Sequence, residues 1–342
     1  NYGVDYCNPC GERTEHFDPI PSTWKKMIDI LLFWARKGVD GFRCDMAEMV
    51  PSVFWTYAIK EVKNEFPYIL FIGEVYNPSL YDTYIQSGFD YLYDKVGMYD
   101  CVRGVIAGTR KPTEITKQWQ ATNHIKNKML YFLENHDEQR IASPFFANDA
   151  EKGFPGVVVS SLLLPNPFML YAGQELGEPG MDAEGFSGRD GRTTIFDYWG
   201  IDKLYRGYYK KNALTAQEKV IWDKYNAILR IASKEKVVSV GSFFDLMYAN
   251  PLTSNFNSNS LYAFIRAYKQ EVLLVVANFS DLEMQCAINI PRHAFEHLSL
   301  SEGQVNAVDL LTGETTFQMF SPEKPFKVGI DPYGARVYKF IL

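Results

Sequence analysis

The chain has 342 residues, of which 46% are hydrophobic and 22% charged, and its formal net charge is −6. This length suffices for one large hydrophobic core and favours a second, smaller domain. The negative charge argues against a nucleic-acid partner, because phosphate binding needs clustered Lys and Arg side chains. No run of 18 apolar residues occurs in the sequence, so we expect no membrane-spanning helix and no membrane partner.

The aromatic and cysteine contents give further information about the class of protein and its binding sites. The aromatic share of 15% fits a carbohydrate binder, because rings stack on sugar faces, although the core is the expected place for most single rings. Five cysteines, an odd number, do not describe a disulfide framework. Cys7 and Cys10 form a CxxC pair with no second pair at a matching spacing, and His16 is a poor supplement. We therefore expect no metal site and incidental thiols.

The amino terminus gives little information about the cellular compartment. The chain begins with Asn1 and shows no signal peptide. The compartment stays open, with a slight preference for the cytoplasm.

The first predicted elements are a helix, a strand and a second helix. Ser22 is expected to cap the first helix, and Lys37 with Gly38 is expected to end it. A short strand over residues 39–44 leads directly to Asp45. The second helix is expected from Pro51 to about residue 66.

Strands and helices continue to alternate after the second helix. Further strands are predicted over residues 69–75, 89–93, 129–133 and 168–172, with a buried helix over residues 157–164. This alternation is typical of parallel βα units.

The pattern changes after a helix predicted over residues 216–232. Segments with strand character follow at 261–267, 272–277, 284–290 and 335–341, separated by turn residues, with no long helix among them. An antiparallel sandwich of roughly 100 residues fits this part. We predict an α/β domain over residues 1–238 and an all-β domain over residues 239–342.

Three acidic residues, Asp45, Glu74 and Asp137, stand at or just after the carboxyl ends of predicted strands. In a βα barrel these ends converge on the face where catalysis is built. Glycosidic cleavage needs one carboxylate to attack the anomeric carbon and another to protonate the departing oxygen. Arg43 lies on the same side of its strand as Asp45, where its charge would hold Asp45 ionised. Each acid alone is more simply a helix cap or a solvated charge, but three in distinctive local sequences favour catalysis.

Those local sequences resemble motifs of glycoside hydrolase family 13, the α-amylase family. GFRCD at residues 41–45 resembles the strand-four motif, FIGEV at 71–75 the strand-five motif and FLENHD at 132–137 the strand-seven motif. YAGQE at 171–175 is similar to the strand-eight segment. The resemblance covers nearly the whole chain. It implies a partial (β/α)8 TIM barrel, comprising strands 4–8, followed by an antiparallel β-sandwich.

The resemblance also implies a role for each residue of the motifs. Asp45 would be the nucleophile, Glu74 the general acid and then the base, and Asp137 the residue that holds sugar hydroxyls and stabilises the transition state. The substrate-binding residues would be Arg43, His136 and Asn135, and we add Tyr76 because this aromatic residue lies beside the strand-five motif. Tyr76 is as well suited to core packing as to a stacking floor for glucose rings.

The implied activity is retaining hydrolysis of α-1,4-glucosidic bonds in starch, glycogen or maltooligosaccharides. The same three acids would serve transfer of the glycosyl group to another sugar, and a non-catalytic sugar-binding relative is a further alternative. Glu48 and Met49 stand where amylases typically place a Lys-His pair. The choice among amylase, oligoglucosidase and glucan-transferring activities therefore stays open.

The family's first motif, at strand three, has no counterpart in the sequence. We expect barrel strands one to three to precede Asn1, and residues 1–342 alone to be unstable or inactive because a half barrel leaves unpaired edges. A soluble, active protein of these residues would contradict this expectation. No cofactor is required by this segment, whereas the full-length protein would be able to bind Ca²⁺ through ligands in the missing part.

Overall fold

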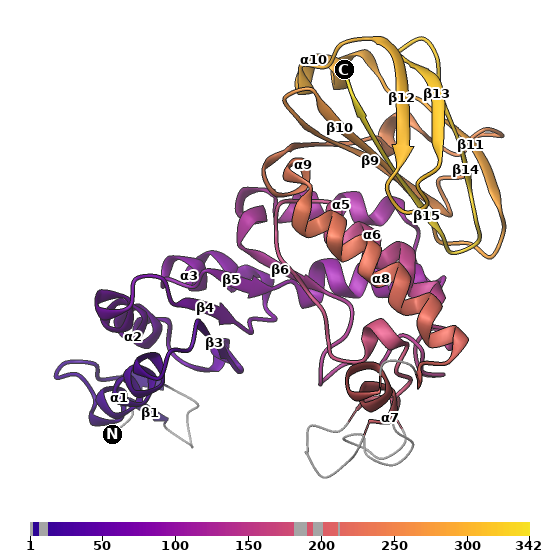
Figure 1. Cartoon of the computed structure of the whole chain (residues 1–342). Coiled ribbons are helices and arrows are strands. Elements are labelled where there is room, and N and C mark those ends of the chain that lie inside the picture. The colour runs from indigo at the N-terminus through magenta and orange to yellow at the C-terminus, as the bar shows by residue number, and fades with distance from the viewer. Residues whose placement is uncertain (1–2, 7–12, 181–189, 194–200, 211–212) are drawn as a thin grey trace. The chain divides into compact units, whose positions relative to one another are not determined.

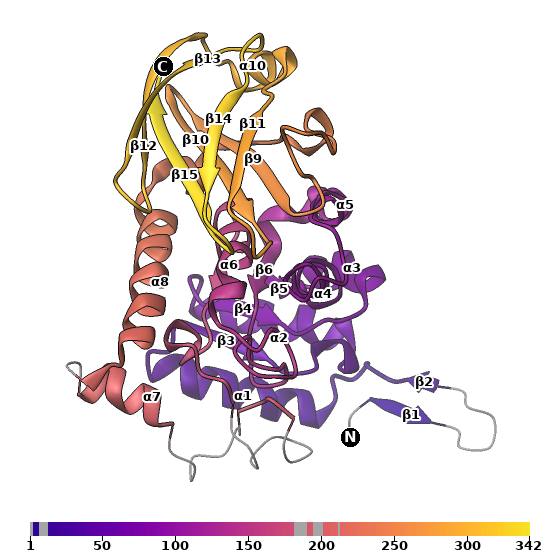
Figure 2. The same cartoon turned by 90° about the vertical axis from the view of Figure 1, so that its right-hand side faces the viewer.

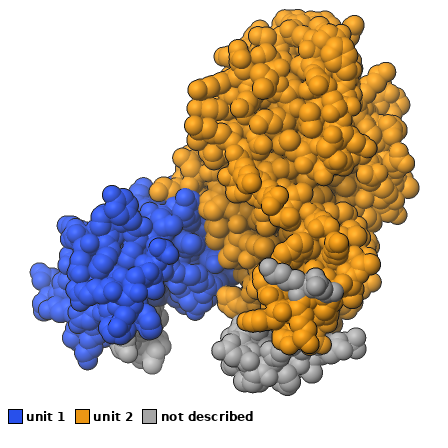
Figure 3. Space-filling view, viewed as in Figure 1, with its two compact units in different colours: residues 1–93 blue, residues 94–342 orange. Residues whose placement is uncertain are grey.

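The computed structural model describes residues 3–6, 13–180, 190–193, 201–210 and 213–342 (Figure 1). The chain divides into two compact units, residues 1–93 and residues 94–342 (Figure 3). The CxxC pair of Cys7 and Cys10 lies outside the described residues.

The first unit is built on three parallel strands in the order β3-β4-β5. The register pairs Cys44 with Gly73, so Asp45 and Glu74 each follow a strand end at the same level. The elements of this unit are β1 (Val4–Tyr6), β2 (Arg13–Glu15), α1 (Ser22–Arg36), β3 (Gly41–Cys44), η1 (Ala47–Met49), α2 (Ser52–Glu65), β4 (Leu70–Gly73), η2 (Pro78–Leu80), α3 (Tyr81–Gln86) and β5 (Tyr91–Tyr93).

Helices α1 and α2 pack against each other through apolar faces, which arise because apolar residues recur every three to four positions in each helix. Trp24 and Ile28 are buried on α1, and the Trp24 ring meets Phe54 of α2 edge-on at 5.4 Å. The predicted capping role of Ser22 is wrong, because Pro21 is the N-cap and no side chain caps the helix. Gly38 follows the helix end with φ +91°, a conformation that favours glycine.

The second unit begins with two further parallel strands, β6 (Met129–Phe132) and β7 (Phe168–Met169), which pair Tyr131 with Phe168. Strand β7 is shorter than the predicted strand over residues 168–172, and the chain turns at Gly173 with φ +94°. The helices around these strands are η3 (Lys95–Tyr99), α4 (Asp100–Ile106), α5 (Thr113–Ala121), η4 (Asn123–Lys128), η5 (Glu151–Gly153), α6 (Phe154–Leu162), η6 (Gln174–Leu176), α7 (Asp202–Leu204), η7 (Tyr205–Tyr209), α8 (Ala216–Lys234) and α9 (Lys236–Val240).

Helix α8, the longest helix among the described residues (Figures 1 and 2), packs against the fully buried α6. It starts at a capping box, in which Thr215 Oγ1 accepts from the Glu218 N–H while the Glu218 carboxylate accepts from the Thr215 N–H.

The chain ends in antiparallel sheets that account for the predicted all-β segment (Figure 2). Six strands have the order β13-β12-β15-β10-β9-β8, and β11 pairs with β14. The side chains of Phe320, Phe326 and Phe340 meet between these strands. The elements are β8 (Ser242–Asp245), η9 (Met247–Ala249), β9 (Leu261–Tyr268), β10 (Glu271–Asn278), β11 (Met284–Ile288), α10 (Arg292–Leu298), β12 (Gly303–Asp309), β13 (Thr315–Phe320), β14 (Phe326–Ile330) and β15 (Ala335–Ile341).

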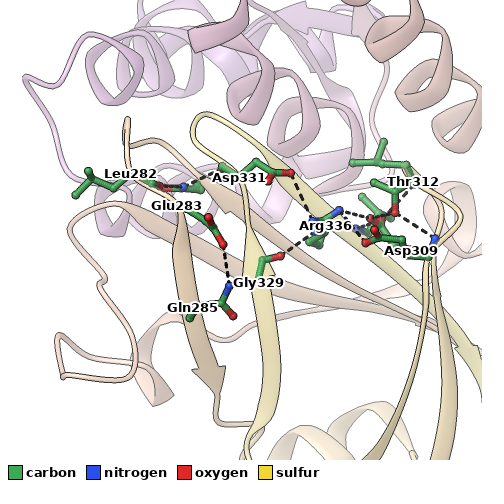
Figure 4. A network of polar contacts seen from close by, with 12 residues as sticks. Leu282, Glu283, Gln285, Asp309, Thr312, Gly329, Asp331 and Arg336 are labelled. Carbon is green, nitrogen blue, oxygen red and sulfur yellow. Dashed lines mark hydrogen bonds and ion pairs between the residues drawn. The ribbon is translucent and has the colours of Figure 1, made fainter.

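Two arginines tie this β-rich segment together and to the helices. Arg336 donates to the Gly329 carbonyl at 2.8 Å and to the buried Asp309 carboxylate at 3.1 Å, which joins β14, β15 and the end of β12 (Figure 4). Arg266 of β9 is fully buried and donates to the carbonyls of Leu162 and Leu163 at the end of α6. It also donates to carbonyls at residues 238 and 241, at the end of α9. One side chain therefore satisfies the carboxyl ends of two helices.

Candidate active site

The guanidinium of Arg43 lies between two of the three predicted catalytic acids. Its Nη1 donates to Asp45 Oδ1, and its Nη2 lies 3.0 Å from Glu74 Oε2. Burial alone would lower the pKa of Arg43, but the ion pairs with Asp45 and Glu74 outweigh it and raise the pKa. The expected pairing of Arg43 with Asp45 is thus present, and Arg43 also reaches Glu74.

The two carboxylates that Arg43 contacts differ in their surroundings. The Asp45 side chain is 71% exposed, whereas that of Glu74 is 4% exposed. Glu74 Oε2 also accepts the Met46 backbone N–H at 2.7 Å. Met46 adopts a left-handed conformation with φ 43°, which costs conformational energy in a residue that carries a Cβ. The turn immediately after Asp45 therefore places the Met46 backbone N–H where it donates a hydrogen bond to Glu74.

Gly73 brings Glu74 close to the neighbouring strand. A Cβ at this position would lie 2.9 Å from carbons of Leu92 and Phe89, which is closer than carbon atoms approach in proteins. The glycine is thus required by packing beneath the acid that follows it.

Glu48 joins the two loops that carry these acids. Its Oε2 accepts the backbone N–H groups of Tyr76 at 3.2 Å and Asn77 at 3.0 Å. The Tyr84 hydroxyl donates to the Glu48 carbonyl at 3.1 Å, which fixes the other end of the residue. In the sequence Glu48 stood out only as a departure from the Lys-His pair. Its acidic character was the signal, because a carboxylate can accept backbone donors where a lysine cannot.

The third predicted acid, Asp137, lies in the second unit on the loop after β6. The buried Asn135 shapes this loop, because its Oδ1 accepts the N–H groups of Asp137 and Glu138, both at 2.9 Å. His136 Nε2 lies 3.3 Å from Asp137 Oδ2, and both side chains are about one-third exposed. Arg192 Nε donates to the Asp137 carbonyl at 2.5 Å. Asn135, His136 and Asp137 thus form one polar cluster.

A buried ion pair supports that cluster from below. Arg140 Nη1 lies 2.8 Å from Glu134 Oε2, and both side chains are almost fully buried. Burial raises the pKa of Glu134, an effect that the charge of Arg140 opposes. Arg140 also donates to the Ala172 carbonyl at 2.9 Å and stacks on the Tyr171 ring at 4.0 Å. The pair therefore connects the loop after β6 with the segment after β7.

The predicted site residues fall into two groups, one in each unit. Those of the first unit are Arg43, Asp45, Glu74 and Tyr76, and those of the second are Asn135, His136 and Asp137. The contacts made by Glu48, Arg192 and the Met46 N–H were missed, because side-chain and backbone partners distant in sequence leave no local pattern.

Within the described ranges, no three His, Cys, Asp or Glu side chains are grouped so as to hold a metal ion. The described residues therefore do not form a calcium cage. No helix in the described part of the chain combines the length and apolar character needed to cross a bilayer.

Residues 20–226 match the family model for the alpha amylase catalytic domain. The chain is also 22% identical to neopullulanase 2 of Thermoactinomyces vulgaris over 329 residues, which is 95% of this chain and 48% of that protein. It is 25% identical to alpha-amylase 3 of Dictyoglomus thermophilum over 282 residues, 77% of this chain and 54% of that protein. The chain belongs to the alpha-amylase family. It spans about half the length of these curated relatives.

Solved structures agree on the fold. An alpha-amylase from Geobacillus thermoleovorans, complexed with acarbose, matches with a TM-score of 0.70 at 18% identity, over 97% of this chain and 66% of that chain. The predicted fold class, a partial (β/α)8 barrel followed by an antiparallel β segment, is thereby confirmed. The domain boundary near residue 238 stays a prediction, as do the roles of the site residues.

Proposed function

We propose that this chain carries the catalytic acids of a retaining glycosidase that cleaves α-1,4-glucosidic bonds in α-glucans. The observation that carries the proposal is the Arg43 guanidinium, which contacts Asp45 and Glu74 together. A retaining pair needs its carboxyl groups about 5–5.5 Å apart, and a shared guanidinium favours such closeness. The difference in burial supports different roles for the two acids.

In the first step Asp45 attacks the anomeric carbon. Arg43 contacts Asp45 Oδ1, which leaves Oδ2 to form the new bond to the sugar. As that bond forms, the bond from the anomeric carbon to the departing oxygen breaks, and Glu74 gives its proton to that oxygen. Met46 and Arg43 both contact Glu74 Oε2, so Oε1 is the oxygen assigned to this proton transfer.

In the second step a water molecule replaces the enzyme on the sugar. Glu74, now ionised, takes a proton from the water as its oxygen bonds to the anomeric carbon, and the ester bond to Asp45 breaks. Two inversions at the same carbon give net retention. Asp137 and His136 are assigned to sugar hydroxyls, in the loop that Asn135 holds in shape.

Glycosyl transfer uses the same first step, with a sugar hydroxyl in place of water in the second. Support for this alternative comes from a short match to an alpha-1,4-glucan:maltose-1-phosphate maltosyltransferase of Cereibacter sphaeroides, which is 37% identical over 57 residues, 17% of this chain and 10% of that protein. Incubation of the intact protein with maltoheptaose separates the two. Shorter oligomers alone indicate hydrolysis, whereas oligomers longer than seven units indicate transfer.

Variants of the two acids test the proposed roles in the intact protein. Asp45→Asn and Glu74→Gln should each lower turnover of maltoheptaose by at least about 10³-fold. Maltosyl fluoride needs little acid assistance, so Glu74→Gln should recover much of its loss on this substrate, whereas Asp45→Asn should not. Asp29→Asn, an exposed carboxylate on α1, is the matched control. Turnover by Asp45→Asn near the wild-type rate would refute the assignment.

A further inference from the structure

A cavity of about 500 Å³ lies in the second unit, between α5 and η4 on one side and β8, η9 and α10 on the other. Its volume falls in the range of about 300–1,000 Å³ that small-ligand sites occupy. None of its lining residues takes part in the proposed catalysis.

The walls of the cavity are rich in aromatic rings. Trp119 of α5 meets Phe243 of β8 edge-on, with ring centroids 5.0 Å apart. In a second group of rings, the centroid of His293 lies 5.1 Å from that of Tyr248 and 5.2 Å from that of Phe244. Tyr248 is 58% exposed, so its ring is open to a ligand. Rings of this kind offer flat apolar faces beside polar edges.

A buried carboxylate fixes the position of the Trp119 ring. Asp245, only 9% exposed, accepts the Trp119 indole N–H and the Thr116 hydroxyl through Oδ2, both at 2.7 Å. The same oxygen accepts the Tyr262 hydroxyl at 2.8 Å, and Oδ1 accepts the Met247 N–H at 2.7 Å. The carboxylate is therefore occupied by the protein, and its role is to orient the indole before a ligand arrives.

The polar groups at the rim suit a neutral ligand with hydroxyl groups. Gln120 and Asn123 are exposed and carry amides that both donate and accept hydrogen bonds. Lys126 is the one Lys or Arg side chain among the described lining residues, which also include His293 and His297, and it lacks the guanidinium fork that binds phosphate oxygens in pairs. Flat apolar rings beside neutral hydrogen-bonding groups are the chemistry that binds a sugar chain.

We propose that this cavity binds a short segment of α-glucan, as a second carbohydrate site built from residues outside the catalytic motifs. The assignment to an α-glucan, as opposed to another sugar, rests on the proposed function. Sugar rings would lie against Tyr248 and Trp119, and their hydroxyls would meet Gln120, Asn123 and Lys126. Such a site would hold a long substrate on the enzyme between cleavage events.

The test is calorimetric titration of maltoheptaose into the full chain carrying Asp45→Asn, which removes turnover from the measurement. Tyr248→Ala in this background should weaken the cavity's binding at least tenfold, because it deletes an exposed ring. Phe317→Ala, which removes a 71% exposed ring on β13, is the matched control and should change nothing. Asn123→Ala provides a second variant at an exposed rim position.

Two outcomes would overturn the proposal. One is maltoheptaose binding that neither Tyr248→Ala nor Asn123→Ala alters, while both variants keep the circular dichroism and melting temperature of the parent. The other is binding of cellohexaose, but not maltoheptaose, at the cavity. Failure of the proposed catalysis would appear separately, as absence of maltoheptaose cleavage by the wild-type protein with this binding intact.

Discussion

At the scale of single residues, Arg43 is important because its two terminal nitrogens contact two different carboxylates, those of Asp45 and Glu74. A lysine in its place would carry the same charge but present one compact ammonium group, which does not span both acids. We predict that Arg43→Lys lowers turnover of maltoheptaose about 10²-fold, with a shift of only a few degrees in melting temperature. Arg36→Lys, which alters the exposed pair with Glu65, is the control. Turnover within threefold of wild type for Arg43→Lys would contradict this role.

Asp94 predicts a pH dependence of stability. Burial raises its pKa to about 6 from 3.8, and the charge of Asp100 adds to this rise, while backbone N–H groups of Met98 and Gly97 oppose it. The folded state thus binds a proton that the unfolded state has already lost. Stability therefore falls as pH rises from about 4 to about 6, by up to about 3 kcal/mol.

Asp94→Asn should remove this contribution, because Asn keeps an acceptor for the Met98 N–H without ionising. Urea unfolding at several pH values gives the measurement. The variant should gain stability relative to wild type as pH rises from 4 to 7. A difference between the two proteins that stays constant over this range would show that Asp94 does not titrate as described.

At the scale of elements, Glu48 connects the turn after β3 with the turn after β4. Hydrogen bonds to a charged group contribute about 1.5–3 kcal/mol, which suffices to order a loop. We predict that Glu48→Ala lowers kcat about tenfold, because the backbone at Tyr76 loses its acceptor. Glu48→Gln keeps an acceptor oxygen and should restore most of the rate. Met49→Ala, at a side chain 73% exposed, is the neighbouring control.

Equal kcat values for Glu48→Ala and wild type would contradict this positioning role. A fall in both Glu48 variants by the same factor would instead assign the effect to the negative charge. The two variants therefore separate hydrogen bonding from electrostatics at one position.

Arg266 links elements in the second unit, since it donates to carbonyls at the ends of both α6 and α9. Burial lowers the pKa of Arg266 to about 10, because removing the charged guanidinium from water costs free energy. Arg266→Met would remove that charge but leave four buried carbonyl groups without this donor. We expect a net destabilisation on the order of 3 kcal/mol in urea unfolding. Arg230→Met, at an exposed site on α8, should change stability by less than about 0.5 kcal/mol.

At the scale of the whole molecule, the sequence predicts helices and strands better than it predicts the contacts between residues that are distant in sequence. The strand expected at 335–341 matches β15, and the strand at 129–133 nearly matches β6, because apolar runs bounded by turn residues carry a local signal. Helix α10 was not predicted, because its seven residues inside a β-rich segment are too few to show a helical periodicity in the sequence. The Ser22 cap was wrong because Pro21 already supplies the N-terminal geometry.

The candidate site shows the same division. Asp45, Glu74 and Asp137 were predicted from their local sequences, and the Arg43–Asp45 contact follows from strand alternation. The Arg43–Glu74 contact and the Glu48 bonds join residues about 30 positions apart. Only the folded register of β3 against β4 brings these residues together, so no local pattern in one sequence reveals them.

The central claim is that Asp45 forms a covalent bond to the sugar. The most direct measurement treats the intact protein with a 5-fluoro-α-glycosyl fluoride, which forms the intermediate faster than water removes it. Mass spectrometry should then find one glycosyl adduct on the tryptic peptide of residues 44–60, with fragmentation placing it on Asp45. Absence of an adduct during turnover with inversion of configuration, or an adduct on another carboxylate, would contradict the account.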